Sequence, residues 1–127
     1  MIYKYWLPPI LWMTIIFFLS SRESVLVSNI GTVNFFFFKS LHVIEYGILY
    51  FLLFRAFLTK NAKQTNNAYM KAFIFSFLYA LSDEIHQLLV PTREGRLRDV
   101  FIDVVGMVFT YMYIKYYINK SFLKKLL

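Results

Sequence analysis

Six of the seven acidic residues of this 127-residue chain lie within or beside strongly apolar segments. These six are Glu45, Asp83, Glu84, Glu94, Asp99 and Asp103, whereas Glu23 lies elsewhere. Placing a carboxylate at membrane depth costs roughly 2.5–3.5 kcal/mol on insertion scales. Because buried carboxyl groups can act as general acids or bases or bind ligands, this concentration predicts a functional site.

Helical spacing places these acids beside histidine, tyrosine and glutamine, because residues three or four positions apart share one face of a helix. Three polar faces are expected: His42, Glu45 and Tyr46; then Asp83, His86 and Gln87, with Glu84 beside them; then Asp99, Asp103 and Gly106. Gly106 would also let another helix approach closely. At about 1.5 Å per residue, Asp83 and Asp103 would lie roughly 10 Å and 7 Å from the outer helix ends. The three faces could therefore line one cavity.

Three arginines, Arg93, Arg96 and Arg98, lie between the second and third faces. Pro91 would help to end the preceding helix, and Gly95 would supply a turn. Guanidinium groups bind phosphates and carboxylates bidentately, so the arginines could rim an anion site. Taken singly, each polar residue could instead form a hydrogen bond between helices or be an ordinary charged residue at the membrane interface. Their combination favours a functional site.

Four apolar stretches must position these residues, at approximately 3–20, 35–58, 68–90 and 97–118. Each is close to the ~20 residues that cross a bilayer as a helix. Hydrophobic residues make up 59% of the chain, above the roughly 45–50% of soluble domains. We therefore expect an all-α fold in which a single domain over residues 1–127 forms a four-helix transmembrane bundle.

Two details of these stretches stay open. Pro8 and Pro9 fit the first stretch if they lie in the first turn of its helix, where a missing N–H costs little. A cleaved signal peptide is the rival interpretation of that stretch. The aromatic run Phe35–Phe38 could begin the second helix or lie at the membrane interface before Lys39.

The basic residues divide unequally between the two ends of such a bundle. Nine lie on the side of the termini: Lys4, Arg55, Lys60, Lys63, Lys71, Lys115, Lys120, Lys124 and Lys125. Five lie on the other side: Arg22, Lys39, Arg93, Arg96 and Arg98. The positive-inside rule then predicts cytoplasmic N- and C-termini, and a polar site that faces outward from the cell membrane.

Composition excludes other classes of protein and site. The net charge of +7 does not indicate nucleic-acid binding, because the basic residues flank apolar segments and form no separate basic domain. The chain has no cysteine, which excludes disulfides and thiolate metal ligands.

Three motifs resemble those of the VanZ-like family. The patterns are K-x-x-H-x-x-E-Y-x-x-L over 39–49, D-E-x-x-Q over 83–87 and R-x5-D-x6-G over 93–106. The similarity covers most of the chain, from about 39 to 112. It implies a small bacterial membrane protein, in a family named for a member linked to low-level teicoplanin resistance. It names no cofactor.

The resemblance also implies which residues form the site. These are His42, Tyr46, Asp83, Glu84, Gln87, Arg93, Asp99 and Gly106. Two positions depart from the family pattern. Asp103 stands where the family commonly has Asn, which adds an acidic group, and Thr92 stands where Gly often precedes the arginine.

One function consistent with these residues is lowered susceptibility to glycopeptide antibiotics. The protein would bind or modify a membrane lipid or a lipid-linked cell-wall precursor at its outward site. The residues expected to contact that ligand are Tyr46, Gln87, Arg93, Arg96, Arg98 and Asp103. Oligomeric state is not predicted.

An intramembrane hydrolase or transferase is the second possibility, and a structural or partner-docking role is the third. The catalytic candidates are His42, Glu45, Asp83, Glu84 and Asp99. His42 could pair with Asp99 or Glu84 across helices, although no Ser stands in an obvious nucleophile context. A metal-dependent form would use two acid–histidine pairs, His42 with Glu45 and Asp83 with His86.

Overall fold

The computed structural model describes residues 3–58, 62–118 and 125. Within them the chain forms four helices and no strand: α1 (Tyr3–Ser20), α2 (Gly31–Phe57), α3 (Ala62–Gln87) and α4 (Leu97–Tyr117). The prediction of an all-α fold with four helices is therefore confirmed.

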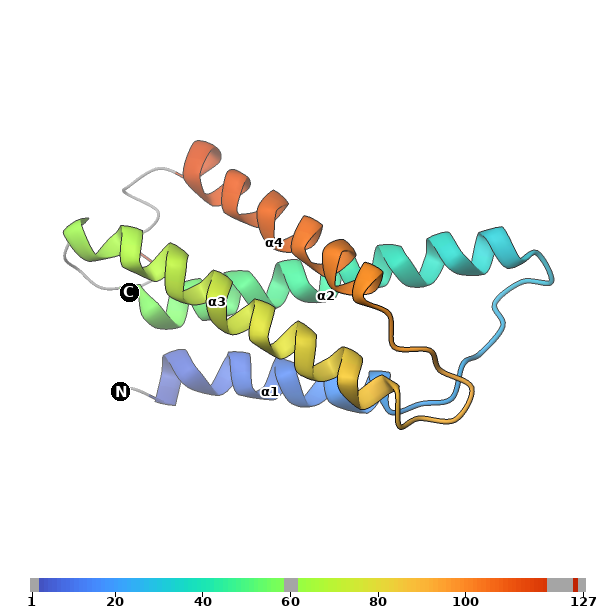
Figure 1. Ribbon diagram of the computed structural model, residues 1–127. Coiled ribbons are helices and arrows are strands. Elements are labelled where there is room, and N and C mark those ends of the chain that lie inside the picture. Colours follow the sequence, from blue (N-terminus) through green and yellow to red (C-terminus); the bar gives the residue numbers. More distant parts are fainter. Residues whose placement is uncertain (1–2, 59–61, 119–124, 126–127) are drawn as a thin grey trace.

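The helices alternate in direction, so that α2 and α4 run parallel to each other and antiparallel to α1 and α3 (Figure 1). α2 and α3 each contact all three other helices, whereas α1 and α4 lie on opposite sides and share no contact among the described residues. The connections 21–30 and 88–96 lie at one end, which we call the site end.

Helix bounds agree closely with the apolar stretches for α1 and α4 and differ for α2 and α3. α2 begins at Gly31, so Phe35–Phe38 is helical. α3 begins at Ala62, because backbone hydrogen bonding continues through a polar segment that hydropathy alone had left outside. It ends at Gln87 rather than 90, because the residue before Pro91 is disfavoured in helical conformation. The earlier end brings Asp83 closer to the site end than expected.

Pro8 and Pro9 lie inside α1, beyond its first turn, so their expected placement was wrong. Each proline removes one backbone donor, and the carbonyl groups that lose a partner lie four residues earlier, near the start of the helix. Pro9 is buried in the bundle. The cost is therefore confined to the end of α1.

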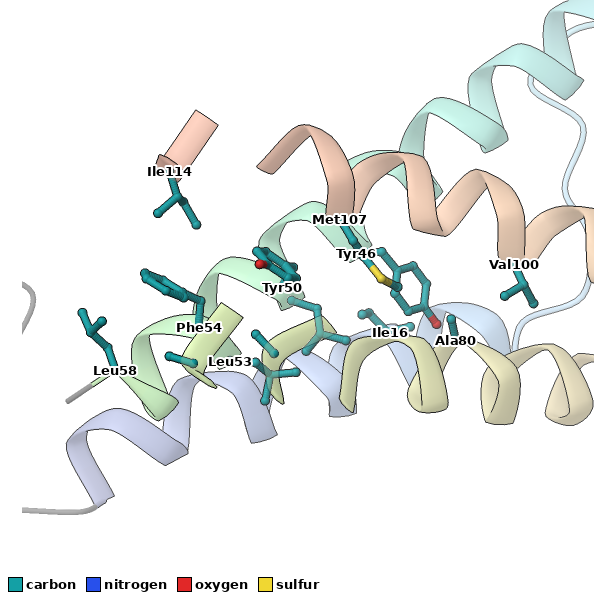
Figure 2. Packing of buried hydrophobic residues seen from close by; sticks show 13 residues of the cluster. Ile16, Tyr46, Tyr50, Leu53, Phe54, Leu58, Ala80, Val100, Met107 and Ile114 are labelled. Carbon is teal, nitrogen blue, oxygen red and sulfur yellow. The ribbon is translucent and has the colours of Figure 1, made fainter. Parts of the chain in front are cut away.

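The core follows one face of α2. Tyr46, Leu49, Tyr50, Leu53 and Phe54 are buried at the spacing of a helical stripe. Figure 2 shows this stripe meeting side chains of the other three helices, which are Ile16 of α1, Ala80 of α3 and Met107 and Ile114 of α4.

Polar contacts join α1 to this core. The indole Nε1 of Trp12 donates to the Glu45 carbonyl oxygen at 2.9 Å. The Tyr79 hydroxyl donates to the Met13 carbonyl oxygen at 2.6 Å. Both bonds link α1 to helices that follow it in the chain, so α1 is an integral part of the bundle.

Glycine allows α2 and α4 to approach closely, as predicted for Gly106. A Cβ atom at Gly106 would overlap the carbonyl oxygen of Val43. A Cβ atom at Gly47 would lie 2.9 Å from the Thr110 hydroxyl and 3.3 Å from the Gly106 carbonyl oxygen. Small residues at such crossings let backbones meet without a gap.

The distribution of polarity is inverted relative to a water-soluble bundle. Large apolar side chains are exposed on the outer faces of all four helices, among them Ile10, Phe36, Leu78 and Phe109. Six carboxyl or amide side chains in the described residues are buried instead, namely Asn34, Asp83, Glu84, Gln87, Asp99 and Asp103. By length and composition, α2 is the one helix in the described part of the chain that could cross a membrane. Lys60, Lys120 and Lys124, which entered the charge comparison, lie outside the described residues.

Candidate functional site

One ion pair and one histidine–carboxylate hydrogen bond join α2 to α4 at the site end. Lys39 Nζ lies 2.5 Å from Asp99 Oδ2, and His42 Nδ1 lies 3.1 Å from Asp103 Oδ1. His42 therefore pairs with Asp103, and the expected pairing with Asp99 or Glu84 was wrong. Asp99 forms its ion pair with Lys39, a residue that the site prediction had omitted. The sequence contained a sign of both contacts. The spacings of K-x-x-H in α2 and D-x-x-x-D in α4 each cover about one helical turn, so two parallel helices can form both contacts at once.

α3 contributes a second layer of buried polar groups. Asp83 Oδ2 accepts a hydrogen bond from Gln87 Nε2 at 3.2 Å. Glu84 Oε2 accepts one from the backbone N–H of Arg96 at 2.9 Å, which ties the loop 88–96 to α3. Tyr46 of α2 is fully buried beside Asp83. Each of these residues was predicted for the site, and the structure brings them to one end of the bundle.

Gly95 lets the loop 88–96 fold back over the end of α3. A Cβ atom there would overlap the carbonyl oxygen of Glu84 and lie 2.8 Å from a side-chain atom of Leu88. The glycine is thus required by close approach, and its φ angle is not in the left-handed region. The same approach brings Arg96 N–H to the Glu84 side chain.

The second histidine lies apart from this cluster. His86 Nε2 is 2.9 Å from the Ser21 hydroxyl, and its ring stacks on Phe17 at 4.6 Å between centroids. Phe17 lies in the last turn of α1, and Ser21 follows that helix directly. The expected metal pair of Asp83 with His86 is therefore not formed, because the aromatic stacking turns the imidazole toward α1. Glu45 is half-buried one turn from His42 and takes part in no ion pair among the described residues.

The three arginines do not form a common rim. The Arg93 guanidinium donates to the carbonyl oxygens of Arg22 at 2.8 Å and Leu19 at 3.2 Å. The Arg96 side chain pairs with Glu94, and both side chains are exposed. Arg98 lies over the Phe35 ring at 5.2 Å, with its Nε 3.6 Å from Asp99 Oδ1. Their side chains therefore point to different partners, and Arg98 belongs to α4 rather than to the loop.

A pocket of about 360 Å³ opens at the site end between the two loops and the start of α2. Its volume falls within the range of small-ligand sites. Its wall combines basic, acidic, amide and apolar side chains, which include Lys39, Arg93, Asp99, Asn34, Gln87, His42, Phe35, Phe38, Val25 and Leu26. Of the three arginines, only Arg93 lines it.

Asn34 near the start of α2 and Thr92 in the loop 88–96 shape this pocket, and neither was predicted as a site residue. Asn34 Oδ1 accepts from the N–H groups of Val27 and Ser28 at 2.9 and 2.8 Å, which fixes the loop 21–30 onto α2. Thr92 Oγ1 accepts from the backbone N–H of Ser24 at 3.0 Å. Thr92 has φ 64°, the left-handed region that glycine adopts freely and a β-branched residue avoids. This is the position where the resembled family often has Gly.

The fold and the site together define an all-helical bundle with a buried polar site at one end. The chain matches the VanZ/LLP1 family over residues 5–119, which include most of α1 and all of α2, α3 and α4. It belongs to the VanZ/LLP1 family, and the resemblance found in its three motifs is confirmed. The comparisons with curated proteins and with solved structures gave no match.

Proposed function

We propose that this protein crosses the bacterial cell membrane four times and binds the anionic head group of a lipid or lipid-linked cell-wall precursor in its site-end pocket. Through that binding it lowers susceptibility to glycopeptide antibiotics such as teicoplanin. The observation that carries the proposal is the pocket, in which one unpaired basic group adjoins an apolar wall.

The outer surface of the bundle supports a position within the membrane. Exposed apolar side chains occur on every helix, including Leu11, Ile44, Ile74 and Met112. A water-soluble monomer rarely exposes so continuous an apolar surface. Lipid would cover these faces and would leave the polar groups inside the bundle, where neighbouring helices satisfy them.

Charges that line the pocket do not cancel fully. Asp99 is neutralised by Lys39 at 2.5 Å, and Glu94 pairs with Arg96. Arg93 donates only to neutral carbonyl oxygens and takes part in no ion pair within the described part of the chain. Its guanidinium therefore keeps a positive charge beside the pocket, which would attract a phosphate or carboxylate.

The remaining wall fits the apolar part of an amphiphile. Phe35 and Phe38 line the side formed by α2, and Val25 and Leu26 line the side formed by the loop 21–30. A head group held at Arg93 would place the neighbouring chain against these side chains. The amide groups of Asn34 and Gln87 could donate hydrogen bonds to the same head group.

A hydrolase that uses a serine nucleophile has less support than head-group binding. Ser82, the residue next to Asp83, is exposed and donates its hydroxyl to the Tyr79 carbonyl oxygen at 2.7 Å. It therefore does not face His42. Binding, rather than acyl transfer to this serine, is the function that the arrangement favours.

The test compares Arg93→Gln with Arg22→Gln in a teicoplanin-sensitive bacterium at matched membrane levels. Both substitutions remove one positive charge at the site end, but the Arg22 side chain is exposed and does not line the pocket. Wild type and Arg22→Gln should raise the inhibitory concentration, and Arg93→Gln should not. Purified Arg93→Gln should also bind a fluorescent polyprenyl diphosphate more weakly by at least about tenfold, since charge-assisted hydrogen bonds contribute roughly 1.5–3 kcal/mol.

Equal protection by Arg93→Gln would reject the pocket as the basis of resistance. No protection by the wild type would reject the resistance role of this chain and leave the binding measurement to decide the ligand.

A further inference from the structure

Three polar side chains from three different helices converge next to the pocket. A ring nitrogen of His42 on α2, a carboxylate oxygen of Glu84 on α3 and one of Asp103 on α4 all lie within 4.8 Å of one another. No short sequence segment contains this set. Only the packing of α2, α3 and α4 brings it together.

Two oxygens of the cluster have no hydrogen-bond partner among the described residues, Glu84 Oε1 and Asp103 Oδ2. Both residues are buried, Glu84 with 5% and Asp103 with 0% of its surface exposed. The other oxygen of each carboxylate is held, by Arg96 N–H and by His42 respectively. The free oxygens are thus fixed in place, and a buried polar atom without a partner is costly.

The one basic side chain paired with either carboxylate within the described residues is the His42 imidazole, which bonds Asp103. Within the described part of the chain, neither forms an ion pair with a lysine or arginine side chain. Lys39 and Arg98, the basic side chains near the site end of α2 and α4, are both directed at Asp99. A divalent cation would balance two buried negative charges and would give both free oxygens a partner.

We propose that His42, Glu84 and Asp103 bind one divalent first-row transition-metal cation, such as Zn²⁺. One imidazole and two carboxylates form a donor set that zinc accepts. Donor atoms around zinc lie roughly 3.4 Å apart, so small side-chain movements would bring the three into coordination. Three protein ligands leave a position open, and His42 also lines the pocket from which an exogenous ligand could reach it.

The site depends on the carboxylate of Asp103. Asp103 stands where the resembled family commonly has Asn, so its charge supplies the second carboxylate. The proposal does not depend on which molecule occupies the pocket, because Arg93 is not among the three ligands. Failure of the head-group binding proposal would leave it unaffected.

The test uses the full chain, purified in detergent without a histidine tag, stripped with a chelator and equilibrated with Zn²⁺. Metal content is measured by mass spectrometry and affinity by competition with a chromophoric chelator. Wild type should hold about one zinc ion per chain, and Glu84→Gln and Asp103→Asn should bind at least about tenfold more weakly, since even loss of a group supporting a ligand costs roughly 10–100-fold. His86→Ala is the matched control for His42→Ala, because it removes the histidine that lies against α1.

Zinc should also raise the thermal midpoint of wild type and His86→Ala, but not that of Glu84→Gln. Helical circular dichroism identifies any variant that does not fold. If His42→Ala does not fold, the isosteric variants Glu84→Gln and Asp103→Asn decide whether the cluster binds the metal. Wild-type protein that holds fewer than about 0.1 zinc ion per chain would overturn the proposal, because a zinc site built from three protein ligands should be filled after equilibration with Zn²⁺. Retention of wild-type affinity by both isosteric variants would overturn it equally, and would indicate a proton shared within the cluster instead.

Discussion

Lys39 on α2 and Asp99 on α4 approach to 2.5 Å between two helices that run in the same direction. His42 and Asp103 repeat the contact about one turn further along both helices, at 3.1 Å. The two pairs set the rotation and the register of α2 against α4, because only one alignment joins both at once. This register also places Gly106 against the backbone of Val43.

Removing one partner of the Lys39–Asp99 pair should therefore destabilise the bundle. Lys39→Ala leaves Asp99, which is 5% exposed, with only the more distant Arg98. We expect a loss of about 2–3 kcal/mol, somewhat below the roughly 3–5 kcal/mol for a fully buried pair that loses one charge. Unfolding in mixed micelles measures this loss, and Lys39→Arg serves as the control that retains the charge.

A double-mutant cycle isolates the contact itself. Lys39→Ala combined with Asp99→Ala should cost clearly less than the sum of the single changes, because the second removes a charge that the first had left unpaired. Strict additivity would show that the two side chains do not interact in the membrane-mimetic state.

Enlarging Gly106 should separate α2 from α4. The added methyl of Gly106→Ala meets the backbone of Val43, which cannot turn aside as a side chain can. We expect a loss of about 2–3 kcal/mol, at the upper end of the usual cost of overpacking. Gly31→Ala is the control, since a Cβ atom at Gly31 meets nothing within 4 Å. Equal stability of both variants would contradict the close helix crossing.

Thr92 should be replaceable with a gain in stability. Its φ of 64° strains a β-branched residue, whereas Asn tolerates this conformation well. Thr92→Asn should stabilise the chain by about 0.5–1 kcal/mol, since a left-handed residue costs roughly 1–2 kcal/mol, part of that is recovered, and the Asn side-chain oxygen offers the Ser24 N–H another acceptor.

Thr92→Val keeps the strain and removes the hydroxyl that accepts from Ser24, so it should be less stable than wild type by about 0.5–1 kcal/mol. Thermal midpoints of the three proteins provide the comparison. If Thr92→Val and Thr92→Asn had the same thermal midpoint, the Thr92 hydroxyl rather than the backbone angle would determine stability at this position.

The proposed orientation can be tested by labelling, because the chain contains no cysteine. Ser24→Cys at the site end should react in intact cells with a maleimide that cannot cross the membrane. Lys4→Cys, at the opposite end of α1, should react only after permeabilisation, since the more basic side of the bundle is expected in the cytoplasm. The cysteine-free wild type provides the background, and the reverse labelling pattern would place the pocket on the cytoplasmic side.

The number of helices and most of their bounds could be predicted from the sequence. Apolar stretches of membrane-spanning length are local properties of the chain, so α1 and α4 were located to within a residue. Helical periodicity likewise placed Asp83 and Gln87 on one face of a helix with Glu84 beside it, and all three side chains are buried. Gly106 was recognised because a glycine in an apolar helix has few roles other than close packing.

Partners, by contrast, were decided by the tertiary structure. Periodicity specifies which residues share a face, but it does not specify which helix that face meets or at what height. For this reason His42 could not be assigned to Asp103, and Lys39 was overlooked beside Asp99. His86 shares a helical neighbourhood with Asp83, yet stacking on Phe17 turns it to α1. The pocket and the His42, Glu84 and Asp103 cluster depend on three helices and two loops at once, and no local pattern in the chain contains that arrangement.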